Sequence, residues 1–382
     1  MTAEALLGTV RPHVENGHVP GAIVGVLRDG EVSLAAAGAT TPGGPTPLTV
    51  DTPVRISSMT KPIMAVLALA LAEGGRLDLT DPVERLVPEL AGWRVLRRLD
   101  GPLDDTVPAD RPPTVEDLLT MRLGLGFVPE GPCAALDAAA AAGLGLGPPD
   151  PSVPLTPDAW IEAFAALPLL DQPGTTWRYD LSYGVLGVVL ARAGGAPLDQ
   201  VARDLVLDPL GMVDTGFVAP PGRLPPSYVR DGESLSVFDE PGTRSRWAAP
   251  PAFPDARGGL ISTAADVLRL AGALLDGGAG ILSPGVVQAM TSDHLTPGQR
   301  RAPSAAPFLD GAGWGYGVQV SRPDDDSPAR AARYGWAGGL GSLWYSWPEH
   351  SAAAVLLTQV MPPSAELFTP FVDAAEALLA PA

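Results

Sequence analysis

Lysine is almost absent from this 382-residue chain, since 24 of its 25 basic residues are arginine and one is lysine. With 43 acidic residues, the formal net charge is −18 at pH 7. Nucleic acids and anionic membrane surfaces are bound through basic patches. The charge balance therefore argues against both as partners, and it says nothing positive about the substrate.

Cysteine and histidine are also scarce. The single cysteine, Cys133, excludes an internal disulfide and a cysteine-rich zinc site. It lies in a stretch rich in proline, glycine and alanine, so we expect no function for it. The four histidines form no His/Glu cluster at metal-ligand spacing, and no metal is predicted. No dinucleotide-binding or P-loop motif occurs, and no cofactor is expected.

Long apolar runs are missing as well. A run such as Ile63–Ala72 is too short to span a bilayer. The N-terminal residues lack a basic region followed by an apolar one, which is the pattern of a signal peptide. The sequence therefore predicts a soluble cytoplasmic protein with no membrane partner.

The one lysine, Lys61, lies three residues after Ser58 in RISSMTKPIMAVLALALAEGGRLDL, the stretch from Arg55 to Leu79. Its apolar part has the composition of a buried helix. Residues i and i+3 share one face of a helix, with Cβ atoms roughly 5–6 Å apart. Arginine keeps its proton, whereas a buried lysine can lose its proton near neutral pH. A neutral Lys61 could then take the proton of Ser58 and make it a nucleophile for acyl transfer.

Strand patterns cluster at both ends of the chain, and helical patterns fill the middle. At the N-terminal end, two strand-like runs flank Asp29-Gly30, which is a strong hairpin signal. The predicted strands are 21–27, 31–37, 316–321, 340–347 and 352–360, and the predicted helices include 3–16, 114–121, 134–142, 157–167, 182–194, 198–210, 263–275 and 366–379. Residues 218–256 are rich in proline and are predicted to be a loop.

The economical architecture is an α+β fold with one antiparallel sheet flanked by helices. Residues 1–75 and 257–382 would form a discontinuous α/β domain. Residues 76–256 would form an inserted, mostly helical domain, with the active site in the cleft between the two.

Seven motifs in a fixed order resemble the class C β-lactamase-like serine hydrolases, the group that includes family VIII carboxylesterases and D-aminopeptidases. They are RISSMTK (55–61), GGRLDLTDPVERLVP (74–88), VEDLLTMRLGLG (115–126), PGTTWRY (173–179), DPLGMVDTGF (208–217), GGLISTAAD (258–266) and GWAGGLG (335–341). The resemblance covers most of the chain and implies a β-lactamase/transpeptidase-like fold.

The resemblance also implies roles for individual residues. Ser58 would be the acylated nucleophile, Lys61 its partner base, and Tyr179 the catalytic tyrosine that shuttles protons. The oxyanion hole would consist of the N–H groups of Ser58 and Gly339. The third family motif would be Trp336-Ala337-Gly338.

Two departures from the family pattern bear on the substrate. Many relatives have Tyr-x-Asn in the second motif, where this chain has Tyr179-Asp180-Leu181. Lactamases and peptidases begin the third motif with a cation that faces a substrate carboxylate, where this chain has Trp336, as many of the esterases do. Both departures favour small carboxylic esters over β-lactams. The change at Met121-Arg122-Leu123-Gly124, where relatives often have His-Thr-Ser-Gly, has no functional explanation in the sequence.

Several alternatives stay open at this stage. The same residues would serve an acyltransferase, a β-lactamase or D-aminopeptidase, or a non-catalytic penicillin-recognising sensor. A Ser-His-Asp triad is disfavoured because no Gly-x-Ser-x-Gly elbow occurs. Substrate-binding candidates are Trp336, Gly338, Phe127, Trp314 and Trp344, although aromatic residues are more often part of a core. The oligomeric state is not predicted.

Overall fold

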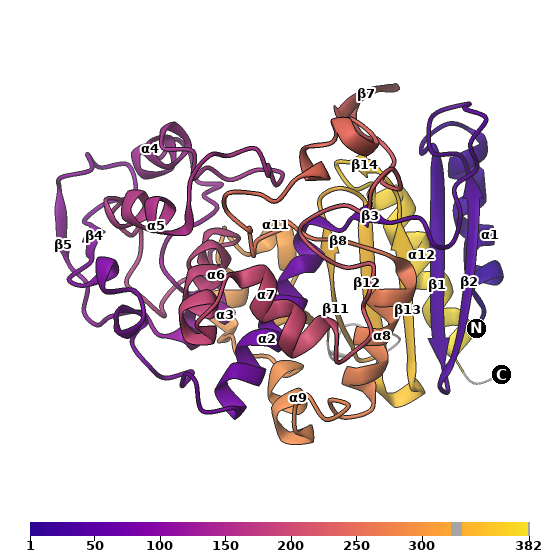
Figure 1. The fold of residues 1–382 in the computed structure, drawn as a ribbon. Coiled ribbons are helices and arrows are strands. Elements are labelled where there is room, and N and C mark those ends of the chain that lie inside the picture. Colours follow the sequence, from indigo (N-terminus) through magenta and orange to yellow (C-terminus); the bar gives the residue numbers. More distant parts are fainter. Residues whose placement is uncertain (322–330, 381–382) are drawn as a thin grey trace.

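The computed structural model describes residues 1–321 and 331–380. Its centre is a seven-stranded antiparallel sheet with the strand order β2-β1-β13-β12-β11-β10-β9 (Figure 1). The strands are β1 (Gly21–Arg28), β2 (Glu31–Gly38), β9 (Gly313–Trp314), β10 (Gln319–Ser321), β11 (Arg333–Gly338), β12 (Ser342–Trp347) and β13 (Ala352–Leu357). The predicted α+β class with one antiparallel sheet is confirmed.

The two ends of the chain share this sheet because the N-terminal hairpin of β1 and β2 pairs with the C-terminal strand β13. Asp29 and Gly30 connect β1 to β2 with φ angles of 52° and 80°, the left-handed conformation that tight hairpin turns require. Strand β1 then pairs with β13 on its other side, with Ile23 opposite Leu357. The hairpin between β12 and β13 is also as predicted.

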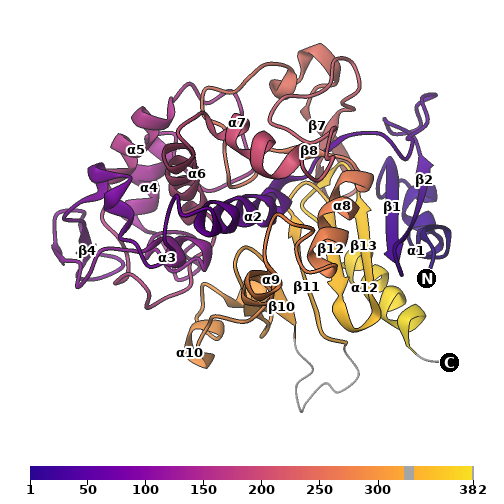
Figure 2. The same ribbon diagram turned by 60° about the horizontal axis from the view of Figure 1, so that its bottom comes forward.

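Helices cover both faces of the sheet (Figure 2). On one face, α1 (Ala3–Glu15) and α12 (Ala365–Leu379) pack together and share a core with β1, β12 and β13. On the other face, α8 (Ala264–Leu275) contacts β1 and β13. Each helix has a stripe of apolar residues facing the sheet, and removing that surface from water stabilises the layers.

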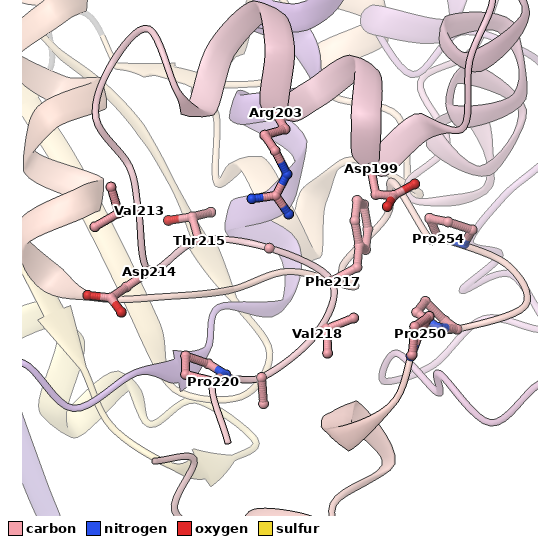
Figure 3. A pocket seen from close by; sticks show the side chains of 13 residues that line it. Asp199, Arg203, Val213, Asp214, Thr215, Phe217, Val218, Pro220, Pro250 and Pro254 are labelled. Atoms are coloured by element: carbon pink, nitrogen blue, oxygen red, sulfur yellow. The ribbon is translucent and has the colours of Figure 1, made fainter. Parts of the chain in front are cut away.

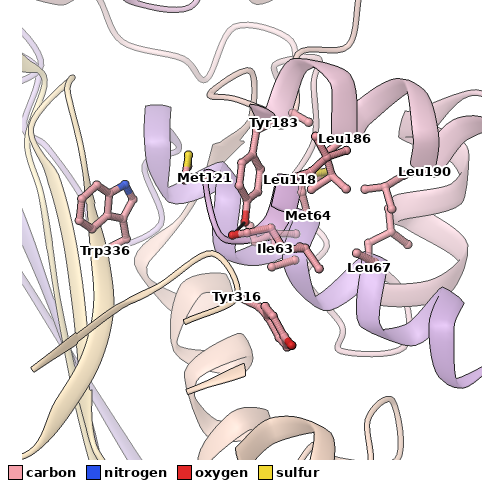
Figure 4. Packing of buried hydrophobic residues seen from close by; sticks show 14 of the residues in the cluster. Ile63, Met64, Leu67, Leu118, Met121, Tyr183, Leu186, Leu190, Tyr316 and Trp336 are labelled. Atoms are coloured by element: carbon pink, nitrogen blue, oxygen red, sulfur yellow. Dashed lines mark hydrogen bonds between the residues drawn. The ribbon is translucent and has the colours of Figure 1, made fainter. Parts of the chain in front are cut away.

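Helix α2 (Thr60–Glu73) runs through the middle of the molecule and is buried on nearly every side. Figure 4 shows Leu67 of α2 beside Leu190 of α6 (Leu181–Gly194), with Ile63 of α2 in the same cluster. The other helices are α3 (Val115–Leu119), α4 (Ala134–Ala141), α5 (Pro157–Ala165), α7 (Leu198–Ala202), α9 (Pro284–Met290), α10 (Pro297–Arg300) and α11 (Ala306–Leu309). Because α2 is embedded in this core, its first turn has a fixed position.

The prediction that residues 218–256 form a loop is wrong. They contain a hairpin of β6 (Ser227–Asp231) and β7 (Ser234–Asp239), and β6 also pairs in parallel with β14 (Val360–Met361). The prolines that suggested a loop lie outside the paired strands, and Gly232 in the turn has a φ of 57°. Two smaller sheets pair β3 (Val54–Arg55) with β8 (Ile261–Ser262) and β4 (Arg94–Leu96) with β5 (Thr106–Pro108).

Within residues 1–321 and 331–380, no single helix is long and apolar enough to cross a membrane. By length and composition alone, one bent pair passes the same test, Leu181–Gly194 with Leu198–Leu207. The division into a discontinuous α/β domain and an inserted helical domain stays a prediction.

Candidate active site

Ser58 lies on a short 3-10 turn, Ser57–Met59, between strand β3 and helix α2. The turn begins with Ser57 at a φ of 47°, a left-handed conformation that costs a non-glycine residue roughly 1–2 kcal/mol. Neighbouring segments hold it: the N–H of Ile56 donates to the Leu260 carbonyl at 3.1 Å, and the hydroxyl of Ser342 donates to the Ile56 carbonyl at 2.8 Å. The serine is thereby fixed at the entry to a rigid helix.

Lys61 follows in the first turn of α2, and its side chain is fully buried. Its Nζ lies 3.2 Å from the Ser58 hydroxyl oxygen, 2.8 Å from Oδ1 of Asp180 and 2.6 Å from the carbonyl oxygen of Arg257. The i, i+3 spacing thus brings the amine and the hydroxyl within hydrogen-bond distance. The contact with Asp180 joins residues 119 positions apart in the chain.

The protonation state of Lys61 differs from the one expected from the sequence. Burial by itself lowers the pKa of Lys61, but the Asp180 carboxylate, helped by Tyr179, outweighs burial. The net effect raises the pKa above its ordinary value of 10.5. The expectation that burial would leave Lys61 without its proton is therefore corrected for the free enzyme, in which the neighbouring carboxylate favours the ammonium form.

Tyr179 lies beside Lys61, with the amine nitrogen 4.6 Å from the centre of the phenol ring. Its oxygen accepts a hydrogen bond of 2.9 Å from the indole N–H of Trp336. The ring stacks on Phe308 at a centroid distance of 4.3 Å and on Trp177 at 5.7 Å. The aromatic neighbours hold the ring, and the indole directs the oxygen.

The segment around Met121, which had no explanation in the sequence, holds the Tyr179 segment in place. The Met121 carbonyl accepts the N–H of Arg178 at 2.8 Å, and its sulfur accepts the N–H of Asp180 at 3.4 Å. Gly126 approaches the Tyr179 carbonyl so closely that a Cβ there would overlap with it. This role could not be found from the motif alone, because it depends on contacts between distant segments.

Gly338 is the last residue of strand β11, next to the turn that carries Ser58, and Gly339 follows it. A Cβ on Gly338 would overlap with the carbonyl oxygen of Ile56 and with the Ser342 side chain. Gly338 is therefore required by packing against the nucleophile turn, whereas the sequence suggested close approach to a substrate. Gly339 lines the cavity described next, as Ser58 does.

A cavity of about 520 Å³ opens at Ser58. It is lined by Ser57, Ser58, Phe127, Leu146, Gly147, Pro148, Tyr179, Asp180, Val229, Phe308, Gly339, Met361, Pro362 and Pro363. Of these lining residues, Asp180 alone carries a charge, and most of the others are apolar. Among the sequence candidates, Phe127 belongs to this lining.

Sequence reasoning missed several lining residues, including Phe308 and the segments 146–148 and 361–363. No local motif marks them, because they come from four separate parts of the chain. Trp336 is buried and contacts Tyr179 instead of lining the cavity. Trp314 and Trp344 are buried in the core, where their indoles donate to the Leu119 carbonyl and the Ser346 hydroxyl. Neither of these two tryptophans lines the cavity.

The histidines lie elsewhere. His13 and His18 contact each other, and the His294 ring stacks on Tyr316. None of the residues lining the cavity is a histidine. In the described part of the chain, no group of three or more His, Cys, Asp or Glu residues is placed to hold a metal ion.

A second cavity, of about 380 Å³, contains none of the predicted site residues (Figure 3). It lies beside α7 and is lined by Asp199, Arg203, Val213, Asp214, Thr215, Gly216, Phe217, Val218, Ala219, Pro220, Pro250, Pro251 and Pro254. The predicted nucleophile and tyrosine line the first cavity, and the buried Lys61 contacts both of them.

Comparisons with known proteins give matches over most of the chain. A family model described as Beta-lactamase matches residues 7–378. Protein Rv1367c of Mycobacterium tuberculosis is 38% identical over 331 residues, covering 83% of this chain and 79% of that protein. Esterase EstB of Burkholderia gladioli is 31% identical over 359 residues, covering 88% of this chain and 85% of EstB.

A solved structure has a similar fold. The structure of EstCE1, described as a hydrolase with promiscuous acyltransferase activity, superimposes with a TM-score of 0.83 and 25% identity. The match covers 98% of each chain. The predicted β-lactamase/transpeptidase-like fold is confirmed, and this chain belongs to the Beta-lactamase family.

Proposed function

We propose that this chain is a serine hydrolase that cleaves small, uncharged carboxylic esters through an acyl intermediate on Ser58. One observation carries the proposal: the Ser58 hydroxyl lies 3.2 Å from the amine of the only lysine, at the edge of a largely apolar cavity of about 520 Å³. The likeness to an esterase over most of the chain supports the same reaction class.

In the proposed acylation step, the Ser58 oxygen attacks the ester carbonyl carbon, and the carbonyl π electrons move to the carbonyl oxygen. The Ser58 proton passes to the Tyr179 oxygen while the phenol proton of Tyr179 passes to the leaving alkoxide, which departs as the alcohol. In deacylation, the water oxygen attacks the acyl carbon and its proton passes to the Tyr179 oxygen. The phenol proton of Tyr179 passes to the Ser58 oxygen as Ser58 leaves.

The proposed oxyanion hole consists of the backbone N–H groups of Ser58 and Gly339. Both residues line the cavity, from the nucleophile turn and from the end of β11. The N-terminus of α2 adds partial positive charge near the first of these donors. Loss of one such donor typically costs about 10²–10³ in rate.

The cavity lining favours neutral esters over β-lactams. A β-lactam antibiotic carries a carboxylate, and recognition of a buried carboxylate needs a cationic partner. The residues that line this cavity include no lysine, arginine or histidine. We therefore rank β-lactamase and D-aminopeptidase activity below ester hydrolysis.

Acyl transfer is the second candidate, in which an alcohol or amine replaces water in deacylation. Support comes from the apolar lining, since exclusion of water favours other acceptors. The description of EstCE1 as a hydrolase with acyltransferase activity points the same way. Added alcohol should then divert part of the acyl group from acid to a new ester.

The test is the hydrolysis of p-nitrophenyl butyrate by wild type and Ser58→Ala. We expect the Ser58→Ala rate to fall roughly a thousandfold or more, because the nucleophile is lost. Ser234→Ala, at an exposed position on β7, makes the same change away from the cavity and should leave the rate unchanged. A fluorophosphonate probe should label Ser58. Unchanged turnover in Ser58→Ala would overturn the proposal.

The remaining alternatives give different outcomes in the same assays. Turnover of nitrocefin or D-Ala-p-nitroanilide exceeding that of the ester would indicate a β-lactamase or a D-aminopeptidase. Labelling of Ser58 by penicillin, with no turnover of any ester, would indicate a sensor.

A further inference from the structure

The Asp180 carboxylate lies between two buried cations next to the nucleophile. Its Oδ1 accepts the Lys61 ammonium at 2.8 Å, and its Oδ2 is 3.5 Å from the Arg257 guanidinium. The exposed fraction is 12% for the Asp180 side chain, 0% for Lys61 and 13% for Arg257. In this setting the charges interact strongly, because little water screens them.

The backbone at Asp180 is in an unusual conformation, with φ 91° and ψ −65°. Residues other than glycine rarely adopt it, and such strain costs on the order of 1–3 kcal/mol. The conformation persists because Lys61 and Arg257 bind the side chain and the Met121 sulfur accepts the backbone N–H. A residue held under strain beside a nucleophile is a candidate for a functional role.

The charges of this cluster balance in only one protonation state of Lys61. Arg257 is paired with Asp255 at 2.8 Å as well as with Asp180. With Lys61 as an ammonium, these two cations and two carboxylates sum to zero. With Lys61 as a neutral amine, the buried cluster would carry an uncompensated negative charge, which is costly in a protein interior.

The other groups around Lys61 are neutral or act in the same direction as Asp180, as Tyr179 does when it raises the pKa of Lys61. The Arg257 carbonyl and the Ser58 oxygen both accept from its Nζ, and Tyr179 presents its ring at 4.6 Å. Tyr183 in α6 is fully buried, and burial raises its pKa well above the usual value, so it stays neutral. Asp180 is therefore the group that contributes most to keeping the charge on Lys61.

We propose that Asp180 is a positioning residue that keeps Lys61 as an ammonium in the free enzyme. Lys61 then stabilises the oxygens of Ser58 and Tyr179. The Ser58 proton goes to Tyr179 instead of to the amine, and Tyr179 gives its own proton to the leaving alkoxide. The catalytic consequence rests on the proposed function, whereas the pairing of Asp180 with Lys61 does not. The raised pKa of Lys61, caused by this carboxylate against the effect of burial, agrees with the geometry.

The test uses the fact that Lys61 is the only lysine. Protein labelled with [13Cε]lysine should show one lysine resonance, whose chemical shift reports whether the amine carries its proton. In wild type we expect the ammonium shift to persist as the pH is raised to 10.5. In Asp180→Asn we expect the titration midpoint to fall below 10.5, because burial then acts without the carboxylate.

Three further variants make the result specific. Asp180→Gly removes the charge and suits the positive φ, so it should lower the midpoint even if Asp180→Asn folds poorly. Asp180→Glu restores the charge and should bring the midpoint back toward that of wild type. Asp199→Asn, at an exposed carboxylate on α7, should leave the midpoint unchanged.

Two results would overturn the proposal: a wild-type amine that titrates near neutral pH, or a midpoint that is the same in wild type, Asp180→Asn and Asp180→Gly. The resonance needs no turnover. An enzyme without esterase activity would therefore contradict the proposed function and leave this measurement valid.

Discussion

Trp336 illustrates, at the scale of single residues, how the site depends on side chains that act through a neighbour. In the family pattern this position faces the substrate, and in lactamases and peptidases it is a cation. Here the indole is buried and donates to the Tyr179 oxygen. The position thus serves the proposed proton carrier, and the cavity is left without a cation.

Trp336→Phe should therefore lower kcat for p-nitrophenyl butyrate by roughly tenfold with little change in KM. The variant removes one hydrogen bond, worth about 1–2 kcal/mol, from an oxygen that carries charge during the reaction. The measurement is steady-state kinetics, with circular dichroism to verify the fold.

Trp93→Phe is the matched control, because its indole donates to the Leu167 carbonyl in the helical part of the molecule. It should affect thermal stability and leave kcat unchanged. Equal losses of kcat in both variants would show that the Trp336 effect is not specific.

At the scale of elements, the hairpin of β6 and β7 is joined to the strand that leads into the nucleophile turn. Asp239 at the end of β7 pairs with Arg55 of β3, and both side chains are almost completely buried. Ser245 also donates to the same carboxylate. The hairpin that the sequence pattern did not reveal therefore contributes to the support of Ser58.

Asp239→Asn should lower the free energy of unfolding by about 3 kcal/mol, because it leaves the Arg55 charge buried without its partner. Urea unfolding at pH 7 measures the change. Asp231→Asn, at an exposed position in the same hairpin, should have little effect. A similar loss in both variants would contradict the role of the pair.

The same pair predicts a loss of stability in acid. Burial raises the pKa of Asp239, but the Arg55 charge and the hydrogen bonds from Arg246 and Ser245 outweigh burial, so the net pKa is lowered from 3.8. A lowered folded-state pKa stabilises the protein above the unfolded-state value. That stabilisation is lost as the pH falls below about 3.8. In Asp239→Asn this part of the acid dependence should disappear.

The elements that could be predicted from the sequence have local signals. The Asp29-Gly30 hairpin, the buried helix after Ser58 and the threonine cap of α8 all depend on residues a few positions apart. The bend at Asp180 and the contact of its carboxylate with Lys61 could not be predicted, because they arise from the packing of segments 119 positions apart. The shape of the cavity could not be predicted either, because its lining comes from eight separate segments of the chain.

At the scale of the whole molecule, the charge distribution predicts which substrates enter the cavity. The net charge is −18, and the one charged residue of the lining is a carboxylate. Both features act against anionic substrates. The location in the cytoplasm and the division into two domains stay predictions.

Methyl butyrate and monomethyl succinate provide a matched pair, since they differ mainly in a terminal methyl group or carboxylate. We expect kcat/KM to be at least tenfold higher for methyl butyrate, as followed by pH-stat titration. The difference should shrink as salt is added, because salt screens the repulsion. Equal rates at low salt would contradict the neutral-ester proposal.

Helices α1 and α12, the first and last helices of the described chain, pack against each other on one face of the sheet (Figure 1). No residue of either helix lines the cavity at Ser58. A tether, a bead or a fused partner attached at either end would therefore leave the entrance to Ser58 unobstructed. Immobilised through its termini, the catalyst should keep the turnover that it has in solution.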